Sequence, residues 1–152
     1  MLLLTLTSYT VLKSGDTYPS NLKPLLTAQK KLIRTISFSQ LRAHSPPLFQ
    51  MWNILPLRLL INLKTAETVY RYIHNNNILM NSRFQPVIHS YETRNSLSGL
   101  FIPRVNTNYG KHSIHYSGSI IWNSIPAEIR LSTSLSLFKH KLFNYYIQSL
   151  DL

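Results

Sequence analysis

Residues 56–74 read PLRLLINLKTAETVYRYIH, and this stretch decides the fold class. Pro56 suits the first turn of a helix, and Asn75-Asn76-Asn77 follows as a stop signal. A spacing that alternates between four and three places apolar residues along one face of an α-helix, ready to pack on an antiparallel partner. The stretch therefore predicts a long helix with a core stripe of Leu59, Leu63, Ala66, Tyr70 and Ile73. Lys64, Glu67 and Arg71 alternate in sign, so we expect their face to be solvated.

The flanking sequence predicts four more helices. Residues 22–37 form an amphipathic helix, with an apolar face of Leu22, Leu25, Leu26, Leu32, Ile33 and Ile36. A short helix capped by Ser45-Pro46-Pro47 is apolar nearly all round, which predicts burial. Residues 113–123 fit a helix or a strand almost equally. We favour a helix because Ile114, Gly118 and Ile121 would then share a tightly packed face. The last helix is capped by Ser132-Thr133-Ser134, with a core face of Leu135, Phe138, Leu142, Tyr145 and Tyr146.

Between these helices, residues 77–111 are rich in polar and turn-forming residues. A short extended piece at 100–105 contains Pro103, which limits it to a sheet edge or to a non-sheet segment. We expect a mainly α fold of four or five helices around one core, with an irregular segment near residues 77–111. A chain of 152 residues, 44% of them hydrophobic, is consistent with a single domain over residues 1–152.

Charge and cysteine content narrow the function classes. The chain has 16 Lys and Arg against 5 Asp and Glu, for a formal net charge of +11, and it has no cysteine. Disulfides, cysteine-based zinc sites and thiol catalysis are therefore excluded. No apolar run reaches the ~18 residues of a membrane span, and the apolar N-terminus lacks the positive n-region of a signal peptide. We expect an intracellular protein, in the nucleus or cytoplasm, that is neither secreted nor bound to a membrane.

The positive charge indicates a polyanionic partner such as nucleic acid. In the helix predicted over residues 22–37, the bases have no carboxylate to neutralise them: Lys23, Lys30, Lys31 and Arg34. A second candidate set lies in the irregular segment and combines bases with an aromatic ring that can stack on nucleobases: Arg94, Arg104, Tyr109 and Lys111. We expect these eight residues to bind nucleic acid, and we expect no catalytic residue, metal site or cofactor.

Several motifs occur together and in order along the chain. The first are TYPSNLKPLL (17–26), QKK (29–31) and IR (33–34), followed by SPPLF (45–49) and NILPL (53–57). Then come TRN (93–95), PRVNTNYGK (103–111), IWNSIP (121–126) and FK (138–139). Over roughly residues 9–150, this set resembles the region that follows the polymerase domain in jockey-like non-LTR retrotransposon reverse transcriptases of animals.

The resemblance implies a mainly helical, thumb-side or post-thumb segment of an RNA-directed DNA polymerase. It divides the chain into the end of the preceding region (1–20), a helical part (22–75), a loop-rich segment (77–111) and C-terminal helices (113–150). Polymerases hold two Mg²⁺ ions with clustered carboxylates, whereas the five acids here are isolated: Asp16, Glu67, Glu92, Glu128 and Asp151. We therefore expect a non-catalytic fragment that binds RNA or a primer–template through its basic surface.

Three alternatives stay open at this stage. The chain could be a helical protein-interaction or structural module whose basic face is incidental, or a relic open reading frame without function. It could also be a metal-dependent enzyme that uses His112 and His115, which would share a face of a continuous helix. We expect an ordinary surface pair at these two histidines.

Overall fold

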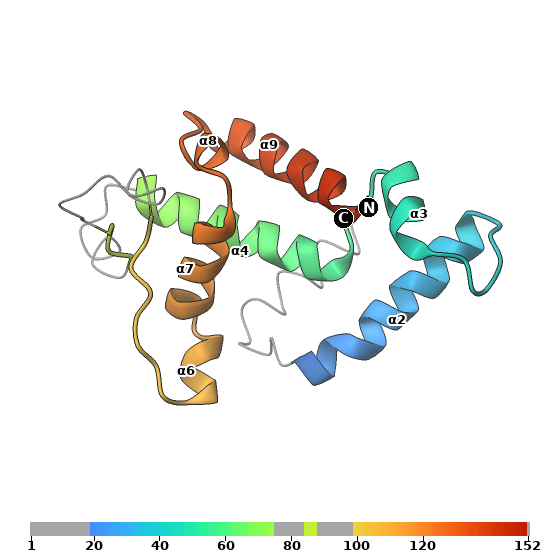
Figure 1. Cartoon of the computed structure of the whole chain (residues 1–152), viewed down its shortest axis with the longest axis horizontal. Coiled ribbons are helices and arrows are strands. Elements are labelled where there is room, and N and C mark those ends of the chain that lie inside the picture. The colour runs from blue at the N-terminus through green and yellow to red at the C-terminus, as the bar shows by residue number, and fades with distance from the viewer. Residues whose placement is uncertain (1–18, 75–83, 88–98, 152) are drawn as a thin grey trace. The chain divides into compact units, whose positions relative to one another are not determined.

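The computed structural model describes residues 19–74, 84–87 and 99–151 (Figure 1). The α-helices within these ranges are α2 (Pro19–Ile36), α3 (Ser45–Met51), α4 (Leu57–His74), α6 (Asn108–His112), α7 (Ile114–Ser124), α8 (Ala127–Arg130) and α9 (Leu135–Gln148). A 3₁₀ turn, η1 (Ser149–Asp151), follows α9. The prediction of a mainly α fold is confirmed.

The five predicted helices correspond to α2, α3, α4, α7 and α9, and the near-even choice at residues 113–123 resolves as a helix. Two short helices, α6 and α8, were not predicted, and α6 begins inside the segment expected to be irregular. The cap predicted for α9 is confirmed, because Ser134 Oγ accepts from the Leu137 amide at 3.3 Å. The cap predicted for α3 is wrong: Ser45 lies inside the first turn, and His44 stands at the N-cap without a side-chain hydrogen bond.

The described residues belong to two compact units, one within residues 1–61 and 143–152 and the other within residues 62–142. In the first unit, Gln29 of α2 forms hydrogen bonds with the connection that follows α3 and with the first residue of α4. Gln29 donates to the Leu55 carbonyl at 3.2 Å and accepts from the Leu57 amide at 2.8 Å. Among the described residues of this unit, the buried apolar side chains are Ile33, Phe49, Leu55, Ile61 and Tyr146.

The apolar face predicted on α2 is only partly buried. Ile33 is buried, but Leu25, Leu32 and Ile36 are between 43% and 56% exposed. The burial predicted for the short helix after Ser45-Pro46-Pro47 is wrong at Met51 and Trp52, which are exposed, whereas Phe49 is buried. Apolar periodicity reports which residues can be buried together, and an unpartnered face remains in solvent.

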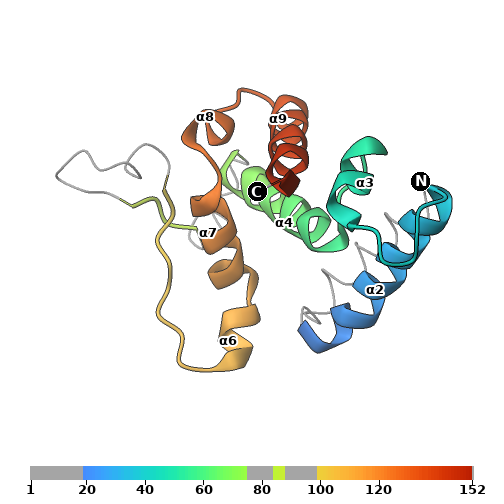
Figure 2. The ribbon, with the colours of Figure 1, turned by 45° about the vertical axis from the view of Figure 1, so that its right-hand side comes forward.

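In the second unit, α7 and α9 both lie next to α4 (Figures 1 and 2). Phe138 of α9 stacks on Tyr70 of α4 and on Trp122 of α7, with ring centroids 4.7 and 5.7 Å apart. A Cβ added at Gly118 would lie 2.9 Å from a methyl group of Val69, so α7 approaches α4 closely at this glycine. This close approach confirms at Gly118 the tight packing predicted for the face it shares with Ile114 and Ile121, which are half-buried. Tyr145, predicted in the core face of α9, is 38% exposed, whereas its neighbour Tyr146 is buried.

An extended segment is held against α7 by one side-chain amide. Asn123 accepts from the Leu100 amide and donates to the Leu100 carbonyl, both at 2.8 Å. Leu100 also forms an isolated antiparallel bridge with Pro86. The extended piece predicted at residues 100–105 thus has an extended bridge at Leu100 and contains no helix, and no strand occurs in the described ranges.

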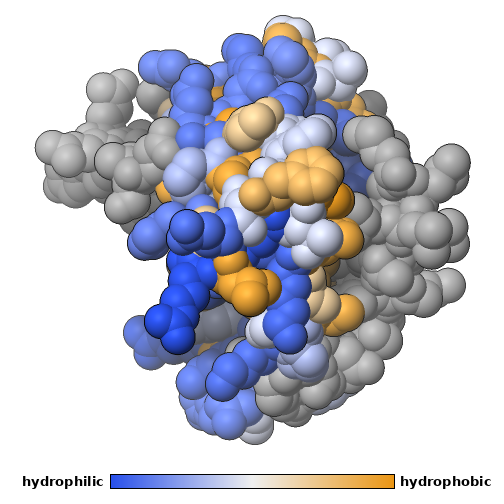
Figure 3. Space-filling model, turned by 90° about the vertical axis from the view of Figure 1, so that its right-hand side faces the viewer, coloured by the Kyte–Doolittle hydropathy of each residue, from blue (hydrophilic) through white to orange (hydrophobic). Residues whose placement is uncertain are grey.

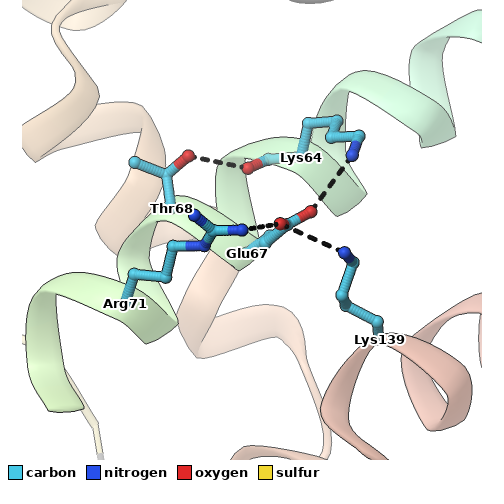
Figure 4. Close-up of polar contacts among 5 residues, drawn as sticks. All are labelled: Lys64, Glu67, Thr68, Arg71 and Lys139. Carbon is cyan, nitrogen blue, oxygen red and sulfur yellow. Dashed lines mark hydrogen bonds and ion pairs between the residues drawn. The ribbon is translucent and has the colours of Figure 1, made fainter. Parts of the chain in front are cut away.

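The polar face predicted on α4 is not solvated at Glu67, which is 6% exposed (Figure 4). Glu67 accepts from Arg71 at 2.7 Å, from Lys64 at 3.2 Å and from Lys139 of α9 at 3.2 Å. Burial raises the pKa of this carboxyl, but the hydrogen bonds and charges of Lys64 and Lys139 outweigh burial and hold the pKa below its ordinary value. The carboxylate therefore ties α9 to α4.

Candidate nucleic-acid interface

Helix α2 presents an exposed cationic face. Lys23, Lys30 and Lys31 are all exposed, with Lys23 and Lys30 two helical turns apart and Lys31 beside Lys30. The helix contains no acidic residue, and every ion pair found among the described residues involves Glu67 of the other unit. The three lysines, which we call the α2 basic face, therefore keep their charges available to an external anion.

Arg34 differs from these lysines because its side chain already has an internal contact. It is half-buried, and its Nε donates to the Ala43 carbonyl at 2.9 Å. This bond fixes the connection between α2 and α3. Of the four bases predicted on this helix, Arg34 thus has a structural contact, and no side-chain hydrogen bond or ion pair joins the other three to another described residue.

Phe38, which the sequence did not predict as a binding residue, is the second residue after the end of α2. The amide of Ser39 donates to the Arg34 carbonyl at 3.0 Å and that of Phe38 to the Thr35 carbonyl at 3.2 Å, the bonds of a Schellman motif. Phe38 occupies the left-handed position of this motif with φ 51°, where glycine is usual, and its side chain is 99% exposed. The only sequence signal is an aromatic residue between two serines just beyond the last apolar turn.

The second predicted basic set lies in the other compact unit. Arg104, Tyr109 and Lys111 are exposed, the last two on α6, whose N-cap Thr107 accepts from the Gly110 amide at 3.1 Å. Arg94 lies outside the described residues. Three of these four residues lie close together in the sequence, within residues 104–111, and the structure places their side chains on the surface.

The metal half-site considered at His112 and His115 does not form on one helix face. His112 ends α6 and His115 lies in α7, with the extended Ser113 between them. The His115 ring lies 5.5 Å from the ring of Phe84. Across the described ranges, no three histidine or carboxylate side chains gather where they could hold a metal ion.

No helix among the described residues combines the length and apolar character needed to cross a membrane. Comparison of the chain with protein-family models, with curated proteins and with solved structures finds no match. The basic residues and the exposed aromatic residue are therefore the basis of the functional interpretation.

Proposed function

We propose that this chain binds RNA or a primer–template duplex as a non-catalytic fragment of a non-LTR retrotransposon reverse transcriptase. The observation that carries the proposal is the α2 basic face, three exposed lysines on a helix without a carboxylate. The sequence resemblance supplies the class of nucleic acid. An intracellular location and a lack of polymerase activity in this chain alone belong to the same proposal.

The physical argument rests on phosphate neutralisation. A lysine that contacts a phosphate releases condensed counterions, so the affinity falls as salt is added. For each contact, a tenfold increase in salt concentration lowers the logarithm of the association constant by about 0.9 on duplex DNA and about 0.7 on a single strand. An exposed aromatic ring adds about 1–3 kcal/mol per stacked base and tolerates any sequence. The α2 basic face and the neighbouring Phe38 together have both properties.

Reversing two charges on the α2 basic face tests the phosphate contacts. In the variant Lys30→Glu with Lys31→Glu, we expect the affinity for a short RNA to fall at least about tenfold. The slope of log affinity against log salt concentration should become shallower by the amount that corresponds to the loss of one to two phosphate contacts. The measurement is fluorescence anisotropy at rising salt. The control is Arg58→Glu with Lys141→Glu, which changes the net charge equally at exposed positions outside the α2 basic face.

Equal losses in both double variants would mean that only net charge matters and would contradict a specific α2 interface. If the RNA affinity of the wild-type protein does not change with salt concentration, phosphate contacts are contradicted altogether.

Phe38→Gly tests the exposed ring. Because a left-handed conformation costs a non-glycine residue about 1–2 kcal/mol, and because the ring contributes almost no burial, we expect glycine to raise the free energy of unfolding by about 1 kcal/mol. We expect the same variant to bind single-stranded RNA about fivefold or more weakly, since stacking is lost. Urea denaturation and anisotropy measure the two effects. Unchanged RNA affinity in a stabilised Phe38→Gly protein would show that the ring does not stack on bases.

A second candidate function, a protein-interaction module, is favoured by the exposed apolar residues of the same unit. Leu25, Leu32 and Ile36 of α2 are exposed, unlike Ile33 of the same helix, which is buried. Leu41, which follows α2, is 89% exposed. Figure 3 shows apolar side chains, in orange, at the surface among hydrophilic ones in blue. The charge reversal distinguishes the two functions, because a partner held by apolar contacts should survive it.

A further inference from the structure

Two exposed aromatic residues, Phe38 and Trp52, are attached to neighbouring points of the first unit. Helix α3 lies beside α2 (Figures 1 and 2), and the indole Nε1 of Trp52 donates to the Ser37 hydroxyl at 2.8 Å. Phe38 is the residue that follows Ser37. Phe38 is 99% exposed and Trp52 is 44% exposed, so both rings are accessible from solvent. We call these two residues the aromatic pair.

The indole of Trp52 is held in place by its own helix and by Ser37. Trp52 is the C-cap of α3, and this helix end is closed by the Ile54 amide, which donates to the Phe49 carbonyl at 2.9 Å. Gln50 ties α3 to the last helix of the same unit, because its Nε2 donates to the Ile147 carbonyl at 3.0 Å. The indole N–H points along the plane of the ring, so the bond to Ser37 orients the ring without covering its faces. A ring fixed in this way loses little freedom when it binds a ligand.

The backbone around the aromatic pair is unusual. Among the described non-glycine residues, positive φ occurs at Phe38 and at Asn53, both 51°, and Asn53 directly follows Trp52. Asparagine tolerates this conformation, whereas phenylalanine pays about 1–2 kcal/mol for it. The Phe38 ring has almost no burial to offset that cost, so packing of the fold does not explain its presence. Strained residues of this kind cluster at binding sites.

The α2 basic face leads directly to the aromatic pair. Lys23, Lys30 and Ser37 follow one another at intervals of seven residues, which is almost two helical turns, so they lie in one row along α2. The helical geometry extends to Ser37, because its amide donates to the Ile33 carbonyl at 3.0 Å. No Asp or Glu occurs between residues 17 and 66. The row therefore places uncompensated positive charge next to accessible rings, which is the combination that single-stranded nucleic acid requires.

We infer that the aromatic pair stacks on unpaired bases of single-stranded RNA while Lys23 and Lys30 contact its phosphates. The inference rests on the proposed function and deepens it, because it adds Trp52 to the site and names single strands as the preferred ligand. The bases of a duplex are already paired and stacked on one another, whereas the bases of a single strand are free to stack on aromatic side chains. Each base stacked on a protein ring contributes about 1–3 kcal/mol.

The test uses the full chain and three matched probes: an unstructured RNA strand, the same strand without its bases, and the duplex that the strand forms with its complement. Fluorescence anisotropy is measured at raised salt concentration, which weakens phosphate contacts. We expect the intact strand to bind at least about fivefold more tightly than the abasic strand, and more tightly than the duplex, since at least one base is stacked. Binding of the intact strand should also quench tryptophan emission, and Trp52→Phe, which leaves Trp122 as the only tryptophan, should abolish this quenching.

Variants separate stacking from other contacts. Trp52→Leu and Phe38→Gly should each weaken binding of the intact strand about fivefold or more and leave the affinity for the abasic strand unchanged. The matched control is Leu41→Ala, which removes an exposed apolar side chain without a ring from the connection between α2 and α3. We expect it to change neither affinity. If Trp52→Leu does not fold, the comparison of the three probes on the wild-type protein decides.

Equal affinity for the intact and abasic strands, with binding still weakened by Lys30→Glu and Lys31→Glu, would overturn the inference and leave the proposed function standing. Equal losses in Leu41→Ala and Trp52→Leu would indicate general apolar contact, as with a protein partner, and would overturn the inference as well. If none of the three probes binds, the proposed function and the inference are both contradicted.

Discussion

Replacing Phe138 with alanine is expected to lower the free energy of unfolding by about 4 kcal/mol. The Phe138 side chain is 0% exposed and stacks on Tyr70 and Trp122, so it joins α9 to both α4 and α7. Truncation of a buried phenylalanine removes its transfer free energy and leaves a cavity, with a usual cost of about 3–5 kcal/mol. Since whole domains are stable by only about 5–15 kcal/mol, Phe138→Ala should leave the protein partly unfolded at 37 °C. Urea denaturation followed by circular dichroism measures the change.

Phe138→Leu is the matched control, because leucine keeps most of the apolar volume and loses the ring contacts. We expect it to cost about 1–2 kcal/mol. A Phe138→Ala cost below about 1.5 kcal/mol would mean that α9 does not depend on this aromatic cluster for its packing on α4.

The sequence predicted the helices well because their signals are local. The alternating spacing in residues 56–74 identifies α4, and Ser134 marks the beginning of α9. Gly118 shows that a single residue type can also predict packing, since the missing Cβ implied a close helix contact and Val69 supplies it.

Features that depend on the tertiary partner could not be read in the same way. The pattern of Lys64, Glu67 and Arg71 is that of a solvated face. In the folded chain Glu67 is buried and pairs with Lys139 of α9, which the local sequence does not reveal. The exposure of Leu25 and Leu32 is equally invisible to periodicity, which does not state whether a partner is present. For the candidate interface, charge patterning identified the α2 lysines, whereas the left-handed Phe38 required backbone geometry.

Glu67→Gln is expected to lower the free energy of unfolding at pH 7 by about 2–3 kcal/mol. The substitution keeps the size of the side chain but leaves Lys64, Arg71 and Lys139 around a neutral group. Loss of one member of a buried ion pair costs about 3–5 kcal/mol, and the partial exposure of the three bases reduces this figure through solvent screening. Glu128→Gln is the control, because Glu128 is exposed, and we expect a change within about 0.5 kcal/mol.

The dependence of stability on pH separates the charge of Glu67 from its packing. The pKa of Glu67 is lowered in the folded protein, so its charge contributes stability above the unfolded pKa of about 4.3, and this contribution is lost as the pH falls through the folded pKa. The difference in unfolding free energy between wild type and Glu67→Gln should therefore be constant above about pH 5.5 and shrink below pH 4. Urea titrations from pH 3 to 7 give this difference directly, and subtraction removes the contributions of the other carboxyls. If the difference stays constant down to pH 3, the destabilisation comes from altered packing, and the carboxylate charge does not hold α9 to α4.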